Sequence, residues 1–77
     1  MKKTGFFLRT VNADNALNPT QLFHSGGTLV EALADFADTV ARNAEERFYQ
    51  EITLVERFRT ERGEIDERTV ATTGRIA

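Results

Sequence analysis

The chain has 77 residues, of which 40% are hydrophobic, and its ten basic and twelve acidic side chains give a formal net charge of -2. This length limits it to a single domain, residues 1–77, with one layer of sheet against one or two helices. Without cysteine it can form no disulfide framework, thiolate zinc site or thiol nucleophile, and one histidine cannot build a multi-histidine metal site. The mild acidity argues against a simple basic nucleic-acid binder, and no apolar run suits a membrane span or signal peptide. We therefore expect a cytoplasmic protein with no direct nucleic-acid or membrane partner.

The N-terminal part of the chain predicts two strands joined by a loop. Residues 5–11 are rich in aromatic and β-branched side chains and are bounded by a glycine and an Asn- and Asp-rich stretch, which is typical of a strand. The stretch 12–19 holds three Asn, one Asp and the only proline, so it predicts a loop. A weaker strand candidate at 20–25 ends at Gly26 and Gly27.

A helix over 29–47 is the clearest prediction. Thr28 and Glu31 have the capping-box spacing, in which the hydroxyl and the carboxylate each accept one orphan backbone N–H. Large apolar residues then recur every three or four positions, which predicts one buried helix face. The members of this face are Leu29, Leu33, Phe36, Val40, Ala44 and Phe48.

From residue 49 the hydrophobic period changes to two, which predicts a hairpin of strands 50–60 and 64–74 around a turn at 61–64. Glu56 interrupts the apolar face of the first arm, so a bulge is expected there. The fold class is therefore α+β, with an antiparallel sheet of three to four strands packed on one amphipathic helix. The predicted core is Phe6, Leu8, Leu33, Phe36, Val40, Phe48, Ile52, Leu54 and Phe58.

Catalysis is not expected, because His24 is the only imidazole and has no evident partner for acid–base work. Residues 26–28 precede the helix and allow an anion site at the N-terminus of the helix. The alternative is that Gly26 and Gly27 only turn the chain into the helix. This segment lacks the spacing of a P-loop, and no acidic loop is present to wrap a hard cation. We therefore predict no enzyme activity, cofactor or metal.

Charge is segregated along the chain, and this is the main functional clue. Residues 31–56 hold seven acids and two arginines, whereas residues 1–30 hold three basic side chains and one acid. A row of carboxylates on a helix can imitate a phosphate backbone and occupy a basic groove on another protein. The alternatives are that the acids form an ordinary solvated face and that the arginines make cross-strand ion pairs. The candidate partner-binding residues are Glu31, Asp35, Asp38 and Glu45 on the helix, with Arg57, Arg59 and Arg62 on the hairpin.

A second stripe on the helix consists of small apolar residues, at positions 30, 34, 37 and 41. Small side chains allow another helix to approach closely, and a domain of this size gains stability from association. Self-association through this stripe or through a sheet edge is therefore expected, and a homodimer is one such assembly.

In its size, charge and layout, with a compact sheet, one helix and no catalytic constellation, the chain resembles the small anti-CRISPR proteins of phages and other mobile elements. The resemblance transfers no site residue. It implies a stoichiometric, non-enzymatic inhibitor that binds a host protein or ribonucleoprotein and blocks a nucleic-acid-binding surface of a CRISPR effector complex. The alternative is a small cellular homo-oligomeric binding module with a layout similar to dodecins, which hold flavins between subunits, although this chain has no Trp and one Tyr for such stacking.

Overall fold

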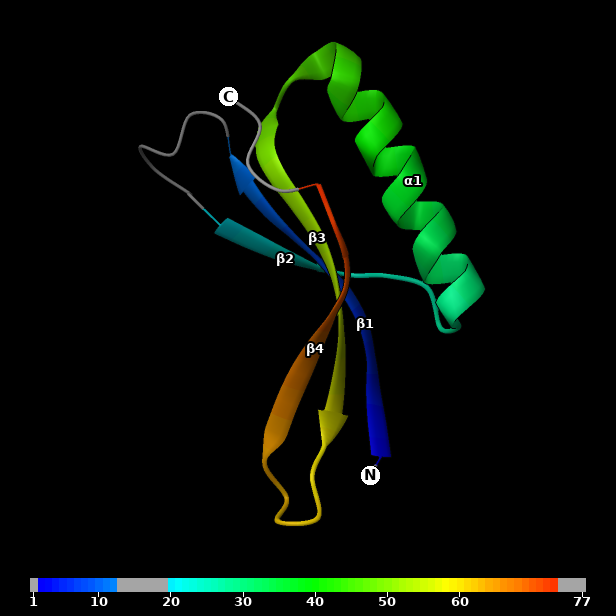
Figure 1. Ribbon diagram of the computed structural model, residues 1–77, viewed down its shortest axis with the longest axis vertical. Coiled ribbons are helices and arrows are strands. Elements are labelled where there is room, and N and C mark those ends of the chain that lie inside the picture. The colour runs from blue at the N-terminus through cyan, green and yellow to red at the C-terminus, as the bar shows by residue number, and fades with distance from the viewer. Residues whose placement is uncertain (1, 13–19, 74–77) are drawn as a thin grey trace.

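The structure is a computed structural model that describes residues 2–12 and 20–73. In these residues the chain forms a four-stranded antiparallel sheet with one helix packed against it, which confirms the predicted α+β class (Figure 1). The strand order is β2-β1-β3-β4. The elements are β1 (Lys2–Asn12), β2 (Thr20–His24), α1 (Leu29–Glu46), β3 (Tyr49–Arg59) and β4 (Ile65–Thr72).

All the predicted strands are present, the weak candidate at 20–25 is β2, and the predicted pairing of the last hairpin is confirmed; the central pairing of β1 with β3 was not predicted. The loop predicted at 12–19 lies outside the described residues from position 13 onward, as does position 74 of the last predicted strand. The bulge expected at Glu56 is displaced: the register shifts between Leu54 and Val55, and the extra residue is Val70 on β4. A further shift occurs beside Gly5, whose φ of 140° favours glycine.

Helix α1 begins at its predicted cap. The Glu31 N–H donates to Thr28 Oγ1 at 3.2 Å, and the Thr28 hydroxyl donates to Glu31 Oε1 at 3.1 Å, so the carboxylate accepts from the hydroxyl rather than from a backbone N–H. The helix ends at Glu46 because Arg47 takes a left-handed conformation, with φ 56°, and its N–H donates to the Asn43 carbonyl.

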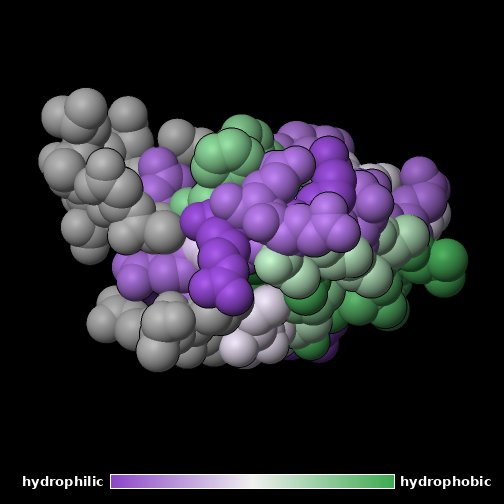
Figure 2. Space-filling view, turned by 90° about the horizontal axis from the view of Figure 1, so that it is seen from above, coloured by the Kyte–Doolittle hydropathy of each residue, from purple (hydrophilic) through white to green (hydrophobic). Residues whose placement is uncertain are grey.

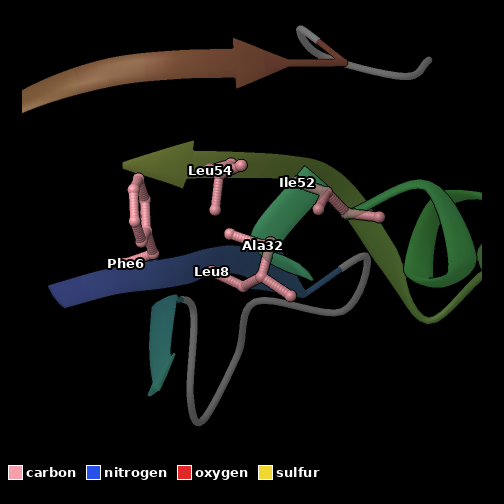
Figure 3. Packing of buried hydrophobic residues seen from close by; sticks show 5 residues of the cluster. All are labelled: Phe6, Leu8, Ala32, Ile52 and Leu54. Carbon is pink, nitrogen blue, oxygen red and sulfur yellow. The ribbon is translucent and has the colours of Figure 1, made fainter. Parts of the chain in front are cut away.

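The core lies between α1 and the two central strands (Figure 3). Phe6 and Leu8 of β1 meet Ile52 and Leu54 of β3, and the helix contributes Ala32, which is fully buried. A small residue at the point of contact lets the helix backbone come close to the sheet. The sheet therefore supplies most of the buried apolar volume.

The predicted core was wrong for two large residues: Leu33 is 39% exposed and Phe48 is 63% exposed. Leu29, expected on the same face, is also exposed. The reason is the rotation of α1 about its own axis. This rotation makes Ala32 and Asn43, rather than Leu33, the buried residues of the helix. Phe36 and Val40 are partly buried and pack against the core, and Phe58 is half-buried.

Two contacts set this rotation, one at each end of the helix. At the start, a Cβ on Gly26 would lie 2.4 Å from Glu31 Cβ, so only glycine lets the linker press on the first turn. At the end, Asn43 Nδ2 donates to the Tyr49 carbonyl at 2.8 Å and Asn43 Oδ1 accepts from the Tyr49 N–H at 2.9 Å. These bonds tie the last turns of α1 to the start of β3.

Candidate protein-interaction surface

The four acidic residues proposed for partner binding lie exposed on α1, and we call them the acidic ridge: Glu31, Asp35, Asp38 and Glu45. The helix with Arg47 carries five acids and two arginines, so its formal charge is -3. At the right of Figure 2, where α1 lies, a hydrophilic surface adjoins a hydrophobic one. The ridge thus lies next to an apolar part of the surface (Figure 2).

The ridge residues differ in the hydrogen bonds and ion pairs that they already make within the fold. Asp35 Oδ2 accepts from the Ser25 hydroxyl at 2.9 Å and from the Gly26 N–H at 3.1 Å, so this carboxylate fastens the linker to the helix. Asp38 pairs with Arg42 at 2.9 Å, as its spacing indicates. Because Asp35 holds the Gly26 N–H, that group is not available to the anion site considered before α1.

The hairpin arginines are not brought together with the acidic ridge. In the described residues α1 contacts β1 and β3 but not β4, and the turn between β3 and β4 projects away from the helix (Figure 1). Arg59 Nη1 donates to the Gly63 carbonyl at 2.9 Å, and Arg62 is exposed in the turn. Glu56, buried beside Phe6 in the register, pairs with Arg68 of β4.

Arg57 belongs to a charged network on the sheet face that α1 leaves open. Its Nε lies 3.2 Å from Glu67 Oε2, and Arg9 Nη2 lies 2.8 Å from Glu67 Oε1. Burial alone would raise the pKa of Glu67, but the hydrogen bonds and charges of Arg9 and Arg57 outweigh it and hold that pKa below its usual value. The guanidinium of Arg57 also lies over the Phe7 ring, 5.2 Å from its centroid. The predicted cross-strand ion pairs are therefore present.

His24 lies at the edge of this network. Its ring meets the Phe7 ring edge-on, with 5.4 Å between the centroids, because β1 and β2 place the two residues opposite each other. This contact gives His24 a packing role.

A hollow of about 420 Å³ lies between α1 and the β1–β2 side of the sheet, and we call it the α1 groove. Its helix residues recur at spacings of three and four, so they form one stripe about 16 Å long. The lining consists of Leu8 and Thr10 from β1, Phe23 and His24 from β2, Asp35, Asp38, Thr39, Arg42, Asn43 and Glu46 from α1, and Phe48 and Tyr49 beyond it.

Two lining residues are both polar and buried, and they differ in their hydrogen bonds. Asn43 has partners for its carbonyl oxygen and for one amide N–H. Thr10 is 1% exposed, and its Oγ1 has no partner among the residues that the structure describes. A buried hydroxyl without a partner costs about 1–3 kcal/mol, so it is an unusual feature in a folded protein.

The rim of the α1 groove is acidic and aromatic. Glu46 makes no ion pair or hydrogen bond with another described side chain, and it adds to the two ridge acids in the lining. Phe23 is 45% exposed on β2, and Phe48 is exposed where the helix gives way to β3. Exposed aromatic rings are enriched in protein-binding surfaces, and here they line the same groove as the carboxylate of Glu46, which is unpaired within the described part of the chain.

The sequence predicted the ridge but not the groove. Thr10 and Phe23 are unremarkable members of short strands, and Glu46 was one acid among many. The one available signal was the spacing of Asp35, Asp38, Thr39, Arg42 and Glu46, which places them on one side of a helix. The strand that completes the groove could not be assigned to that side before the sheet order was known.

Among residues 2–12 and 20–73 no cluster of three or more His, Cys, Asp or Glu side chains is suited to hold a metal ion. In the same residues no helix has both the length and the apolar character needed to cross a membrane. Comparison with protein-family models, curated protein sequences and solved structures found no match to the chain.

Proposed function

We propose that the chain is a small, non-enzymatic protein-binding inhibitor that docks the acidic ridge of α1 on a basic surface of another protein. The basic surface that we propose is a nucleic-acid-binding site of a CRISPR effector complex, blocked by a phage-encoded anti-CRISPR. The observation that carries the proposal is the exposure of all four ridge carboxylates on one helix.

Charge and shape both support this choice. Glu31, Asp35 and Asp38 span about 10 Å along the helix, a length over which a phosphate backbone also presents several charges. Surfaces of opposite charge attract each other during diffusion, which speeds association with a basic groove. Since the described residues hold no clustered metal ligands, and His24 packs on Phe7, binding accounts for the surface better than catalysis does.

The test is a pull-down from a host lysate, followed by binding measurements with the captured complex. The variant neutralises three ridge acids with near-isosteric amides, Glu31→Gln, Asp38→Asn and Glu45→Gln, and glutamine at position 31 keeps the capping-box residue type. We expect affinity to fall by about tenfold or more and its salt dependence to weaken, while the melting temperature stays within a few degrees.

The matched control makes the same charge change on the hairpin, with Glu61→Gln, Glu64→Gln and Asp66→Asn. Its affinity should change much less, because these residues lie away from α1. Equal losses in both variants would mean that only net charge matters and would contradict docking through the ridge. Capture of no CRISPR effector or other nuclease assembly, with phage immunity intact in cells that express the protein, would contradict the inhibitor proposal.

A second candidate function, a homo-oligomeric binding module, is favoured by the apolar flank of α1. We give this name to six exposed apolar residues of the helix: Leu29, Val30, Leu33, Ala34, Ala37 and Ala41. Val30 is 78% exposed. Such a stripe on a small domain suits close packing against a second copy.

Sedimentation over a wide concentration range tests this second function. A self-associating protein should form dimers that Val30→Asp abolishes, because the substitution places a charge in the apolar contact. A monomer at all concentrations would contradict it. A bound flavin would colour the purified protein, and an added ligand would raise its melting temperature.

A further inference from the structure

We propose that the α1 groove receives the side chain of an arginine from the partner protein. This inference rests on the proposed function, since it assumes a basic partner, and it adds the chemistry by which one residue of that partner is recognised.

The charge of the groove selects a cation. Its lining contains three carboxylates and a single guanidinium, and that guanidinium is already paired with Asp38. Glu46 has no charged partner among the described residues, and it stands at the end of the stripe nearest to Phe48 and Tyr49. A group that brings positive charge to Glu46 therefore completes the electrostatics of the groove.

One residue that lines the groove has a buried hydroxyl without a hydrogen-bond partner in the described part of the chain, which favours a cation with several donors. Thr10 Oγ1 is buried and unpartnered among the described residues, although Thr10 lines the groove. Its hydroxyl can accept an N–H from a ligand, which would supply the bond that the fold leaves unmade. A guanidinium carries five N–H donors in a planar fork, so it can serve more than one acceptor.

Aromatic walls favour arginine over a bare ammonium. Phe23 stands exposed on β2, with Phe48 and Tyr49 at the end of the helix. A guanidinium stacks on such rings, and the methylene stem of arginine covers apolar surface. The volume of about 420 Å³ is near the lower limit for ligand sites, which suits one long side chain.

The experiment titrates the ¹⁵N-labelled protein with Nα-acetyl-L-arginine N-methylamide and follows backbone and side-chain amide signals. We expect saturable shifts at Thr39, at Tyr49 and at the Asn43 side-chain amide, all of which line the groove. The control compound is the citrulline analogue, which has nearly the same shape without the charge and should bind about tenfold or more weakly. Equal binding of the two compounds, or shifts that do not saturate, would overturn the proposal.

Two variants locate the site. Glu46→Gln removes the unpaired carboxylate, and Thr10→Val replaces the hydroxyl with a methyl group of similar size; each should weaken the arginine compound about three- to tenfold. Glu61→Gln on the hairpin makes the same charge change as Glu46→Gln outside the groove, and it should leave binding unchanged. If all three variants bind the arginine compound with the same affinity, the groove is not the binding site.

The melting temperature of the Thr10→Val variant gives an independent readout. Because the hydroxyl makes no hydrogen bond with the described residues, its removal should leave the melting temperature unchanged or raise it. A marked fall would mean that the fold uses the hydroxyl, and would overturn the argument from Thr10.

The same variants separate this proposal from the proposed function. If a captured partner depends on the acidic ridge but not on Thr10 or Glu46, the groove proposal fails and the docking proposal stands. If the arginine compound binds as expected and no basic partner is captured, the groove proposal stands and the inhibitor proposal fails.

Discussion

The two faces of the sheet are built from alternate residues of the same strands, yet they are stabilised differently. Leu54 points to the face that α1 covers and belongs to the apolar core, whereas Val55 points to the other face and lies outside that cluster. Both are 0% exposed. On the open face the cross-strand neighbours of Val55 are Phe7 and Thr69, and Phe7 lies under the guanidinium of Arg57.

The difference shows that a small domain can fully bury a residue such as Val55 on a sheet face that its helix does not cover. Long charged side chains extend over the strands while Glu67 holds the two arginines together. The covered face is mainly apolar, although the buried carboxylate of Glu56 pairs with Arg68 there, whereas the open face carries Glu67 between Arg9 and Arg57.

The largest expected effect is on the covered face. Leu54→Ala removes a fully buried side chain from the centre of the core and should lower the free energy of unfolding by about 2–5 kcal/mol, measured by urea denaturation. Val55→Ala is the matched change on the open face and should cost about 1–2 kcal/mol, because fewer atoms are removed. A larger loss at position 55 than at 54 would reverse the comparison.

The next effect concerns the contact that sets the rotation of α1. Asn43→Ala removes both side-chain bonds to the Tyr49 backbone and should cost about 2 kcal/mol in the same measurement. Asn43→Asp keeps the acceptor for the Tyr49 N–H but loses the donor, so an intermediate loss is expected. No loss in either variant would show that the helix is positioned by other contacts.

The open face should respond to pH through Glu67. Its pKa is lowered in the folded protein, so the ionised carboxylate stabilises the fold above the unfolded value of about 4.5. That contribution is lost as the pH falls through the folded pKa. Glu67→Gln should therefore lower the unfolding free energy by at most about 1 kcal/mol at neutral pH, and the difference from the natural protein should shrink in acid. A difference that is constant across the acid range would contradict this role.

The smallest effect is expected on the apolar flank of α1. Leu33→Ala truncates a partly exposed side chain and should cost less than about 1 kcal/mol in the monomer, well below Leu54→Ala. Repeating the measurement at several protein concentrations distinguishes a monomer from a dimer. If the flank is buried between two copies, the cost of Leu33→Ala is larger and depends on protein concentration.

Periodicity and caps predicted the secondary structure well, because they are local properties. The helix begins at Thr28 and the hairpin turns around Gly63, each within a residue or two of its expected place. Leu33 and Phe48 show the limit of the method. A hydrophobic period defines an apolar side of the helix but does not say which part of a wide apolar side meets the sheet.

The acidic ridge and the α1 groove also differ in whether a local sequence pattern predicts them. The ridge depends on the spacing of acids along a single helix, and its exposure was expected from the sequence. The groove combines Thr10 of β1, Phe23 of β2 and Glu46 of α1, which are distant in the chain. No local pattern connects them.

The sequence by itself determined the α+β class, the order of the elements and the segregation of charge, since each follows from residue type and spacing over a few turns or strand residues. Only the tertiary structure decided the rotation of α1, the pairing of Glu67 with two arginines on different strands, and the unpartnered hydroxyl of Thr10 within the described residues. These features depend on close approach between distant segments, such as the contact of Gly26 with the first turn of α1. Packing at that range is governed by the shape of both partners, and the pattern of either one alone does not contain it.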